Sequence, residues 1–453
     1  MEKEKLLEID RRHIWHPFTQ MADWVSQEQL IITGGEGNYL TDVDGKRYFD
    51  GVSSLWVNLF GHRRREIDDA VKSQIDRVAH TTFLGLSHPQ AIVLAKKLVD
   101  ITPGDLSRVF YSDNGSTAME IAIKMAHQYW HQREEGGRGR RSRFVTLTGA
   151  YHGDTIGSVS AGGIDLFHAI FAPLLFETEK MPAPFCYRCP YGMERESCGM
   201  HCAEKIAERL AGGGDTIGAL IMEPVVQGAA GMIVHPDGFL RAMREATQET
   251  GALLIVDEVA TGFGRTGTMF AVEHEGVVPD IMALAKGLTG GYLPLAATMT
   301  TERVFEAFLG RYEEFKTFFH GHSYTANPLG CAAAMATLDI FERNDVIAHV
   351  TAIAEKLRVR LGEIASWSNV GDVRQKGLMV GIELVEEKEG ARPFDPARKV
   401  GQKVAAETRK RGVIIRPLGD VIVLMPPLTT TEDEVELLCE ATFGAIHDVV
   451  KGT

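Results

Sequence analysis

A lysine and an aspartate each stand directly after an apolar run in the middle of this sequence. Asp257 follows the run ALLIV, and Lys286 follows the run IMALA, 29 residues later and directly before Gly287. In α/β proteins the carboxyl ends of parallel strands meet at one edge of the sheet, and ligands bind there. We therefore expect the amine and the carboxylate to face one site.

A third sequence feature can supply an anion site to the same place. Asn114-Gly115-Ser116 follows the apolar run VFY and opens a helical pattern. The first N–H groups of a helix, at the positive end of its dipole, bind phosphate. A lysine, a carboxylate and a phosphate site are together what a pyridoxal-phosphate (PLP) enzyme needs, because the lysine binds the cofactor as an imine and the carboxylate keeps the pyridine nitrogen protonated.

Each of these features also has an ordinary structural interpretation. Lys286 alone could be a surface charge, since most lysines are exposed. Asp257 and Ser116 could be helix caps, since both residue types are favoured there. The three features in combination favour the PLP site over these alternatives.

Two familiar nucleotide-binding patterns in the same region lack the context that they require. The segment GFGRTG at 262–267 matches GxGxxG, but five residues separate it from the preceding strand and no amphipathic helix follows. The segment LLIVDE at 253–258 looks like a Walker B strand, yet GxxxxGK[ST] occurs nowhere in the chain. We interpret 262–267 as a glycine-rich turn.

The elements around these residues alternate between short apolar runs and amphipathic stretches, which predicts an α/β fold with a mostly parallel sheet covered by helices. One helical face is predicted from the apolar positions between 118 and 129, which fall three and four residues apart. Buried strands are predicted at 109–111, 143–147, 219–222, 252–256 and 281–285.

The two ends of the chain have a different pattern. Residues 29–50 contain two strands joined by Asp44-Gly45, which is a hairpin signal. A long amphipathic helix is expected at 345–364, with strands at 378–384, 413–416 and 421–425. We expect a smaller α+β domain built from both termini, with 1–60 and 331–453 flanking a large domain at 61–330.

Composition excludes several classes of function. The chain has 453 residues and a net charge of −13, which argues against a nucleic-acid partner; the short basic stretch at 138–143 is expected to be a solvated loop. No stretch is long and apolar enough to span a membrane. The charged N-terminus does not resemble a signal peptide, so a cytoplasmic protein is expected.

The chain resembles the class III (ω-type) aminotransferases over nearly its whole length. The matching motifs are DNGS around Ser116, AYHGDT at 150–155, MEPVVQG at 222–228, VDEVATGFGRTG at 256–267 and ALAKGLTGGY at 283–292. The resemblance implies PLP fold type I, with a mostly parallel seven-stranded sheet in the large domain. It also implies a homodimer whose active sites are shared between the subunits.

The same resemblance assigns roles to individual residues. It implies that Lys286 forms the imine with pyridoxal 5'-phosphate and that Asp257 pairs with the pyridine nitrogen. It implies that Gly115 and Ser116 bind the phosphate and that Tyr151 stacks on the cofactor ring and borders the substrate.

Within the class, the chain is most similar to the biotin-pathway enzymes that convert 8-amino-7-oxononanoate to 7,8-diaminononanoate. The supporting motifs are RHIWHPFTQM at 12–21, SSLWVNLFGH at 53–62, TFFHGHSYTANP at 317–328 and RPLGDVIVLMPP at 416–427. This likeness implies that His322 and Ser323 reach the phosphate of the neighbouring subunit. It implies a substrate pocket with Trp56, Gly321 and Arg416, in which Arg416 binds the substrate carboxylate; an exposed charge at a strand end is the alternative for Arg416.

Two departures from that group leave the amino donor open between S-adenosylmethionine and lysine. Phe18 stands where many relatives have tyrosine, and the segment at 320–324 reads HGHSY where S-adenosylmethionine users often have HGPTF. Both departures are expected to border the substrate pocket. His320 and His322 could suggest a metal, but side chains at i and i+2 point apart if this segment is a strand, so we expect none.

The predicted function is that of a PLP-dependent aminotransferase in which Lys286 moves protons as general acid and base. A broad ω-transaminase with pyruvate as acceptor is the main alternative. A PLP-dependent aminomutase would share every cofactor residue but need no second substrate. A PLP-sensing protein without catalysis would need a DNA-binding appendage, which the sequence does not show.

Four of the six cysteines cluster in sequence. Cys186 and Cys189 form CxxC, and after eight residues Cys198 and Cys202 form CxxxC. Each spacing suits a thiolate metal site, although eight residues is a short gap between the two pairs. A structural metal, free thiols and a disulfide all stay open, and none is expected to take part in the amino transfer.

Overall fold

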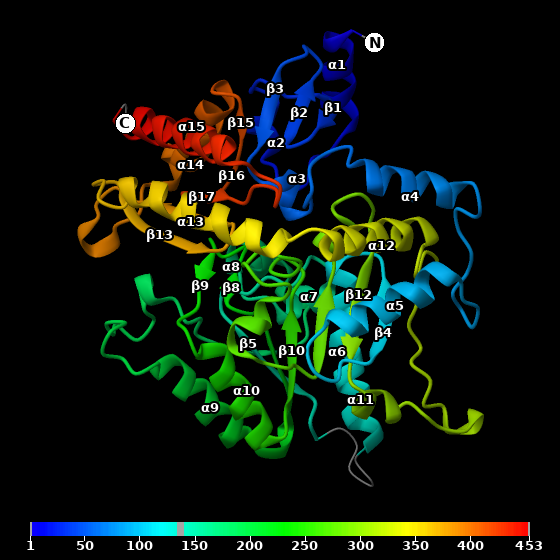
Figure 1. The fold of residues 1–453 in the computed structure, drawn as a ribbon. Helices are drawn as coiled ribbons and strands as arrows, with labels where there is room; N and C mark the ends of the chain where they lie inside the picture. The colour runs from blue at the N-terminus through cyan, green and yellow to red at the C-terminus, as the bar shows by residue number, and fades with distance from the viewer. Residues whose placement is uncertain (1, 134–139, 452–453) are drawn as a thin grey trace.

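A seven-stranded sheet forms the centre of the molecule in the computed structural model, which describes residues 2–133 and 140–451 (Figure 1). Only β12 runs antiparallel to its neighbours in this sheet. The predicted α/β fold with a mostly parallel sheet is therefore confirmed. In order across the sheet the strands are β4 (Arg108–Ser112), β12 (Ala296–Thr300), β11 (Ile281–Leu284), β10 (Leu253–Asp257), β7 (Ile217–Met222), β5 (Arg143–Leu147) and β6 (Glu179–Met181).

The sequence pattern located five of these strands and missed two. Strand β6 has three residues at the sheet edge, too few for a periodic signal. Strand β12 reads AATMT, whose small and hydroxyl side chains do not form an apolar run, although all five residues are buried. Position between two neighbouring strands, rather than composition, makes this segment a strand.

Both faces of the sheet are covered, which explains why its strands are apolar throughout. Leu253 and Ile255 of β10 pack with helix α6 on one face, whereas Leu254 and Val256 belong to the larger core on the other face. The apolar positions predicted for α6 are all buried. The helices are α1 (Lys3–His13), α2 (Met21–Trp24), α3 (Ser53–Trp56), α4 (Arg65–Ile75), α5 (Pro89–Ile101), α6 (Gly115–Arg133), α7 (Ile156–Ala161), α8 (Asp165–His168), α9 (His201–Gly213), α10 (Phe239–Thr250), α11 (Glu302–Glu306), α12 (Pro328–Arg343), α13 (Val346–Ile364), α14 (Val400–Lys410) and α15 (Glu432–Lys451).

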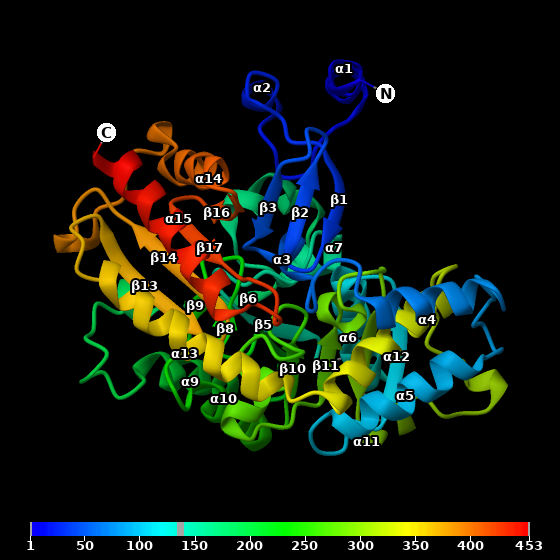
Figure 2. The same cartoon turned by 45° about the horizontal axis from the view of Figure 1, so that its top comes forward.

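The two ends of the chain meet in one layer above this sheet, as Figures 1 and 2 show. Strand β3 from the N-terminal segment pairs in parallel with β15 from the C-terminal segment, and β2 joins β3 through the predicted hairpin. The domain boundaries near residues 60 and 330 stay a prediction. The strands here are β1 (Ile32–Glu36), β2 (Tyr39–Asp42), β3 (Arg47–Asp50) and β15 (Val413–Ile414) in one sheet, β13 (Val370–Lys376), β14 (Met379–Leu384), β17 (Val421–Leu424) and β16 (Arg416–Leu418) in a second, and the pair β8 (Val226–Gln227) and β9 (Ile233–Val234).

The strand predicted at 413–416 is wrong as a single element. The structure divides it into β15 and β16, which belong to different sheets. Pro417 lies in β16, at the sheet edge, which is where a residue without an N–H is tolerated.

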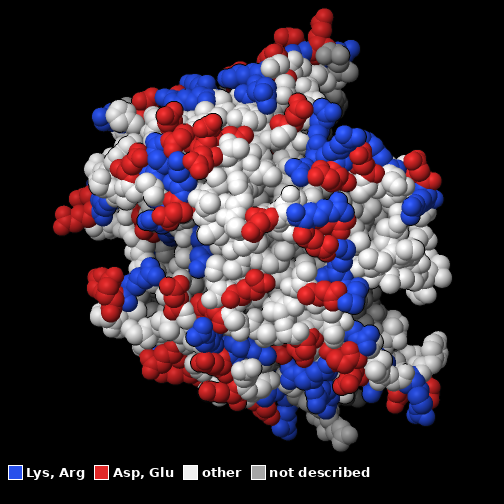
Figure 3. All heavy atoms as spheres, in the orientation of Figure 1, with Lys and Arg blue, Asp and Glu red and all other residues white. Residues whose placement is uncertain are grey.

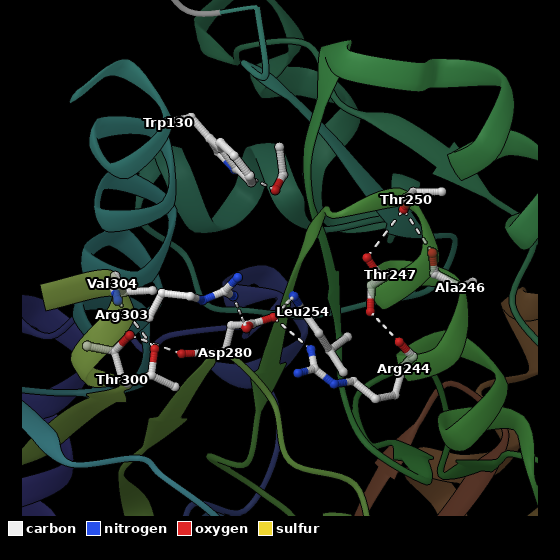
Figure 4. Close-up of polar contacts among 12 residues, drawn as sticks. Trp130, Arg244, Ala246, Thr247, Thr250, Leu254, Asp280, Thr300, Arg303 and Val304 are labelled. Atoms are coloured by element: carbon white, nitrogen blue, oxygen red, sulfur yellow. Dashed lines mark hydrogen bonds and ion pairs between the residues drawn. The ribbon is translucent and has the colours of Figure 1, made fainter. Parts of the chain in front are cut away.

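A buried carboxylate fixes the amino end of β11, the strand that leads to Lys286. Asp280 lies directly before β11 and accepts hydrogen bonds from Leu254 N at 2.8 Å and from Arg244 Nη1 at 2.7 Å (Figure 4). Arg303 pairs with the other carboxylate oxygen. The network ties β10, β11, α10 and α11 together, so the two strands that carry Asp257 and Lys286 are held in register.

The face of the molecule in Figure 3 carries basic and acidic side chains interspersed. Of the basic stretch at 138–143, residues 138 and 139 lie outside the described residues. Arg141 donates to the carbonyl oxygens of Ile217 and Thr250, and Arg143 pairs with Glu179, so these two are not part of a free basic surface. Within the described ranges, no helix is long and apolar enough to cross a membrane.

Candidate functional site

A cavity of about 590 Å³ opens at the carboxyl ends of β4, β10 and β11. It brings together six residues that the sequence singled out, although they come from five separate segments of the chain. These residues are Trp56, Gly115, Ser116, Tyr151, Asp257 and Lys286.

Lys286 is the second residue after β11, which ends at Leu284, and it lines this cavity. It begins a short 3₁₀ turn, Lys286–Thr289, and its φ of 44° is in the left-handed region that non-glycine residues seldom adopt. Its Nζ lies 4.8 Å from the centroid of the Trp56 ring. The alternative of a surface charge is therefore wrong for Lys286.

The surroundings of Lys286 favour its neutral amine. Burial lowers the pKa of Lys286, and the guanidinium of Arg265 acts in the same direction, while the carboxylates of Asp257 and Glu223 oppose them. A neutral amine is the form that is nucleophilic and can accept a proton.

Asp257 is buried at the end of β10 and does not cap a helix. Its Oδ1 accepts a hydrogen bond from Val259 N at 3.0 Å, and its Oδ2 lies 2.8 Å from His152 Nδ1. His152 is therefore the second polar contact of this carboxylate, besides the backbone N–H of Val259. Asp257 can thus present a negative charge from a fixed position at the floor of the cavity.

The beginning of α6 forms another wall. The Oδ1 atom of Asn114 accepts a hydrogen bond from Thr117 N at 3.1 Å, so Asn114 caps the helix and Ser116 does not. The first N–H groups of a helix have no partner within it, and Gly115 and Ser116 lie at that end, lining the cavity. The opening of α6 therefore has the properties of an anion site.

A glycine allows the 150–155 loop to approach this helix end. Gly153 has a φ of +119°, and a Cβ on it would lie 2.0 Å from Ser116 Oγ. The backbone N–H of the next residue, Asp154, donates a hydrogen bond to Ser116 Oγ at 3.1 Å, and its Oδ2 accepts one from the Tyr151 hydroxyl at 2.6 Å. These contacts hold Tyr151 at the cavity wall.

Glu223 and His152 are site residues that the sequence reasoning left without a role. Glu223 is buried and accepts hydrogen bonds from Tyr151 N at 3.1 Å and Gly228 N at 2.8 Å. Burial and the nearby Asp257 carboxylate raise its pKa to about 7. His152 lies in the motif AYHGDT and Glu223 in the motif MEPVVQG. The motifs therefore pointed to these segments, but residue type alone did not mark these two positions as part of the site.

The glycine-rich turn at 262–267 does not open an α-helix, as a nucleotide-binding motif would. It contains a buried arginine instead. Arg265 is 1% exposed and donates to the carbonyl oxygens of Pro426 at 2.6 Å and Asn58 at 2.8 Å. It therefore ties both terminal segments to the rim of the cavity. Burial lowers the pKa of Arg265 to about 9.

Four other predicted site residues do not line the cavity of the single chain. Gly321 and Ser323 are exposed in the loop before α12, while His322 Nδ1 lies 3.0 Å from the carboxylate of Asp113, which does line the cavity. Arg416 is exposed on β16 and has no ion-pair partner in the part of the chain that the structure describes.

The two departures near the predicted substrate pocket also lie outside this cavity. Phe18 is exposed and packs edge-on against Phe167 with centroids 5.4 Å apart. The segment of His320 and His322 is not a strand, and their rings lie 5.1 Å apart, so the expectation that these side chains point apart is wrong. Within residues 2–133 and 140–451, no group of three or more ligating side chains could hold a metal.

The four clustered cysteines line a separate small cavity of about 40 Å³. Their sulfurs are not bonded to one another. Burial raises the pKa of the Cys186 and Cys202 thiols, which favours the protonated form over the thiolate that binds metal. The cluster shares no residue with the lining of the larger cavity.

The residues of the larger cavity fit a PLP molecule. An amine, a buried carboxylate and a helix N-terminus are the three groups that such a cofactor requires. Any side chain at position 153 would collide with Ser116. Glycine therefore lets this loop lie close to the start of α6. Asp257 would face the ring nitrogen, Gly115 and Ser116 the phosphate, and Lys286 the reactive carbon.

Comparison with known proteins finds relatives over almost the whole chain. The model of the family "Aminotransferase class-III" matches residues 20–446. An adenosylmethionine-8-amino-7-oxononanoate aminotransferase of Geobacter sulfurreducens is 50% identical to this chain, over 100% of this chain and 99% of its own length.

Solved structures have the same fold. The adenosylmethionine-8-amino-7-oxononanoate aminotransferase of Methanocaldococcus jannaschii superposes with a TM-score of 0.93 at 44% identity, covering 99% of both chains. A PLP-bound amine transaminase from an uncultivated Pseudomonas species superposes with a TM-score of 0.90 at 39% identity, covering 96% of this chain and 99% of its own.

Proposed function

This chain belongs to the class III aminotransferases, which use PLP, and we propose that it transfers an amino group to 8-amino-7-oxononanoate to form 7,8-diaminononanoate in biotin biosynthesis. The convergence of Lys286, Asp257 and the start of α6 on one cavity carries the enzymatic part of this proposal. The curated relatives, 50% and 53% identical over almost the whole chain, carry the choice of substrate.

The cofactor, when bound, withdraws electrons from the carbon that bears the amino group. Lys286 holds the cofactor and, once released, moves a proton at the donor carbon as general base and acid. The lowered pKa of the Lys286 amine suits that task, because it increases the share of the neutral amine, which is the form that accepts a proton.

Three groups position the cofactor for this proton transfer. Asp257, supported by His152, keeps the ring nitrogen protonated. The amides at the start of α6 bind the phosphate, with the approach of Gly153 allowing a close fit. Tyr151, fixed by Asp154 and Glu223, provides a flat surface for the ring.

Arg416 and Trp56 select the keto substrate. The indole of Trp56 forms one wall of the cavity beside Lys286. Arg416 is exposed and has no ion-pair partner among residues 2–133 and 140–451, and its planar fork can bind a carboxylate with two hydrogen bonds. Because Arg416 lies outside the cavity lining, this role requires the carboxylate tail of the substrate to extend to β16.

The amino donor is S-adenosylmethionine in this proposal, in keeping with the names of the relatives, and lysine is the alternative. A donor screen tests it. The PLP-loaded enzyme is mixed with 8-amino-7-oxononanoate and one donor at a time, and 7,8-diaminononanoate is measured by mass spectrometry, with Lys286→Ala as the blank. Product that forms with S-adenosylmethionine but not with lysine supports the proposal. Product that forms with lysine but not with S-adenosylmethionine would identify lysine as the donor.

A broad ω-transaminase is the second candidate function. An (S)-enantioselective ω-transaminase of Thermomicrobium roseum has the same fold at 37% identity and a TM-score of 0.93. Efficient amino transfer from simple amines to pyruvate, without product from 8-amino-7-oxononanoate, would favour this candidate. Conversion of one amino substrate without any acceptor would instead indicate an aminomutase.

We also propose that the chain acts as a homodimer in which the loop around Ser323 completes the neighbouring site. Large apolar side chains around this loop are exposed, and a Cβ added to Gly321 would lie 3.5 Å from Leu84 Cδ2. An exposed apolar patch of this kind marks an interaction surface. The patch consists of Leu84, Leu86, Phe319 and Tyr324.

Sedimentation equilibrium at micromolar concentration tests the dimer. Leu84→Glu should shift the chain towards the monomer and reduce activity. Val359→Glu is the matched control, because Val359 is similarly exposed but lies on α13. An active monomer, or equal effects of the two substitutions, would contradict the shared site.

A further inference from the structure

Four consecutive residues beside the cavity adopt a left-handed backbone. Ser53, Ser54, Leu55 and Trp56 have φ values of 50°, 50°, 81° and 68°, and none of them is glycine. A left-handed conformation brings Cβ too close to the following carbonyl oxygen, so single left-handed residues are the usual limit. A run of four requires other contacts to hold it.

Asp50 supplies the main contacts. Its Oδ1 accepts a hydrogen bond from Ser54 N at 2.8 Å, and its Oδ2 accepts one from Ser54 Oγ at 2.7 Å. The same Oδ2 lies 3.0 Å from His62 Nε2. The carboxylate is fully buried, so these hydrogen bonds are not weakened by competition with water.

The two ends of the turn are fixed to other parts of the chain. Ser53 Oγ donates to the carbonyl oxygen of Met425 at 2.7 Å. Beyond the turn, the carbonyl oxygen of Asn58 accepts a hydrogen bond from the buried Arg265. The turn is therefore anchored to the C-terminal segment at its start and to the glycine-rich turn at its exit.

This conformation decides which side chains enter the cavity. Leu55 is 50% exposed, whereas Trp56, the next residue, is 7% exposed and lines the cavity. On one side the indole lies against Lys286 Nζ, and it also approaches Gly228, where an added Cβ would lie 3.4 Å from Trp56 Cζ3. A change in the turn would move Trp56 away from both.

We propose that Asp50 is a positioning residue that maintains the left-handed turn Ser53–Trp56, seats Trp56 against Lys286 and thereby sets the size of keto substrate that the site accepts. The proposal rests on the proposed aminotransferase function. Asp50 does not line the cavity, so its effect on the substrate is indirect, through the position of Trp56.

The first test is hydrogen–deuterium exchange of the apoenzyme, which needs neither cofactor nor activity. Asp50→Asn and the milder Ser54→Ala each remove part of the contact with the turn. Both should accelerate exchange in a peptide covering 51–60 and leave a peptide from α10 unchanged. Unchanged exchange at 51–60 in both variants would overturn the proposal, and Ser54→Ala keeps the test usable if Asp50→Asn does not fold.

The second test measures kcat/KM of the PLP-loaded enzyme for 8-amino-7-oxononanoate and for a bulkier aryl ketone. Either substitution should raise the kcat/KM for the aryl ketone, relative to that for 8-amino-7-oxononanoate, by about tenfold. Pocket walls discriminate between substrates by factors of this order. In a Trp56→Ala background the same substitution should leave the ratio unchanged. An equal loss for both ketones, or a shift that persists without Trp56, would show a merely structural role.

A rescue variant completes the design. Leu55→Gly places a residue without Cβ in the left-handed turn, where glycine is unstrained, so it should restore the selectivity of Asp50→Asn. Leu55→Ala, which keeps the Cβ, is the control and should not. Rescue by both or by neither would contradict the proposal. If the wild-type chain forms no product from 8-amino-7-oxononanoate, the proposed function fails, whereas the exchange experiment still decides the role of Asp50.

Discussion

The Nδ1 atom of His152 lies 2.8 Å from the Oδ2 atom of Asp257, and both side chains are buried. His152 comes from the loop after β5, and Asp257 from the end of β10. The histidine thus holds the carboxylate in one orientation, and the Nε2 atom of His152 has no partner among the described residues. A fixed, dry carboxylate is what a protonated ring nitrogen needs beside it.

Asp257→Asn should lower kcat by on the order of 10²-fold or more, because it preserves the shape of the side chain and removes the charge in a dry site. Single-turnover kinetics with saturating PLP measure the effect. Asp257→Glu, which keeps the charge, should lose less. A rate near that of the wild type for Asp257→Asn would assign the ring nitrogen to another group.

Lys286→Ala should abolish nearly all turnover and the visible absorbance of the lysine-bound cofactor. The reason is that the amine of Lys286 is both the attachment point of the cofactor and the proton carrier. Absorbance spectra and product formation are measured in parallel, with Lys205→Ala as a control on the exposed face of α9. A variant that keeps both signals would refute the assignment.

Arg416→Ala should raise KM for 8-amino-7-oxononanoate far more than for a neutral ketone of similar length. The reason is that Arg416 would contribute a charge-assisted contact with the carboxylate of 8-amino-7-oxononanoate, which a neutral ketone cannot make. Steady-state kinetics on both ketones separate the two cases, and the exposed Arg65, on α4, provides a control substitution. Equal changes for both ketones would leave Arg416 as an ordinary surface charge.

Glu223 should make the stability of the apoenzyme depend on pH. Burial raises its pKa from 4.5 to about 7 in the folded chain, so between these values the folded state binds more protons than the unfolded state. Stability therefore falls as pH rises from about 4.5 through about 7. The loss is at most about 3 to 4 kcal/mol, since one pKa unit corresponds to about 1.4 kcal/mol.

Denaturant unfolding of the apoenzyme at several pH values, compared with Glu223→Gln, measures this effect. The glutamine variant does not titrate, so the difference in free energy of unfolding between the two proteins should change across this interval and level off above pH 8. A constant difference would show that Glu223 has an ordinary pKa in the folded chain.

Cys186, Cys189, Cys198 and Cys202 should titrate as four free thiols in the native apoenzyme. The sulfurs are unbonded and burial raises the pKa of two of them. Elemental analysis of untagged protein and thiol titration check this. A structural metal binds tightly enough to survive purification. About one equivalent of zinc or iron per chain would therefore support a metal site, whereas less than about 0.2 equivalents would exclude it.

The sequence by itself determined the α/β class, five of the seven central strands, the α6 face, and Lys286 and Asp257 as the central pair of the predicted site. These inferences depend on local patterns: an apolar run, its end and the residue type that follows it. The motifs determined the family for the same reason, because each motif is a continuous segment. Strands β6 and β12 were not predicted because neither has an apolar run of its own. Their neighbours in the sheet place them as strands.

Only the tertiary structure decided the contacts that join distant segments. Residues such as Glu223 and Arg265 carry ordinary side chains in sequence, and their altered pKa values arise because the fold removes them from water. The left-handed turn at Ser53–Trp56 has no glycine to signal it, since Asp50 and the C-terminal segment impose its backbone. Long-range burial and hydrogen bonding have no periodicity in the sequence, so these parts of the site become visible only when the chain is folded.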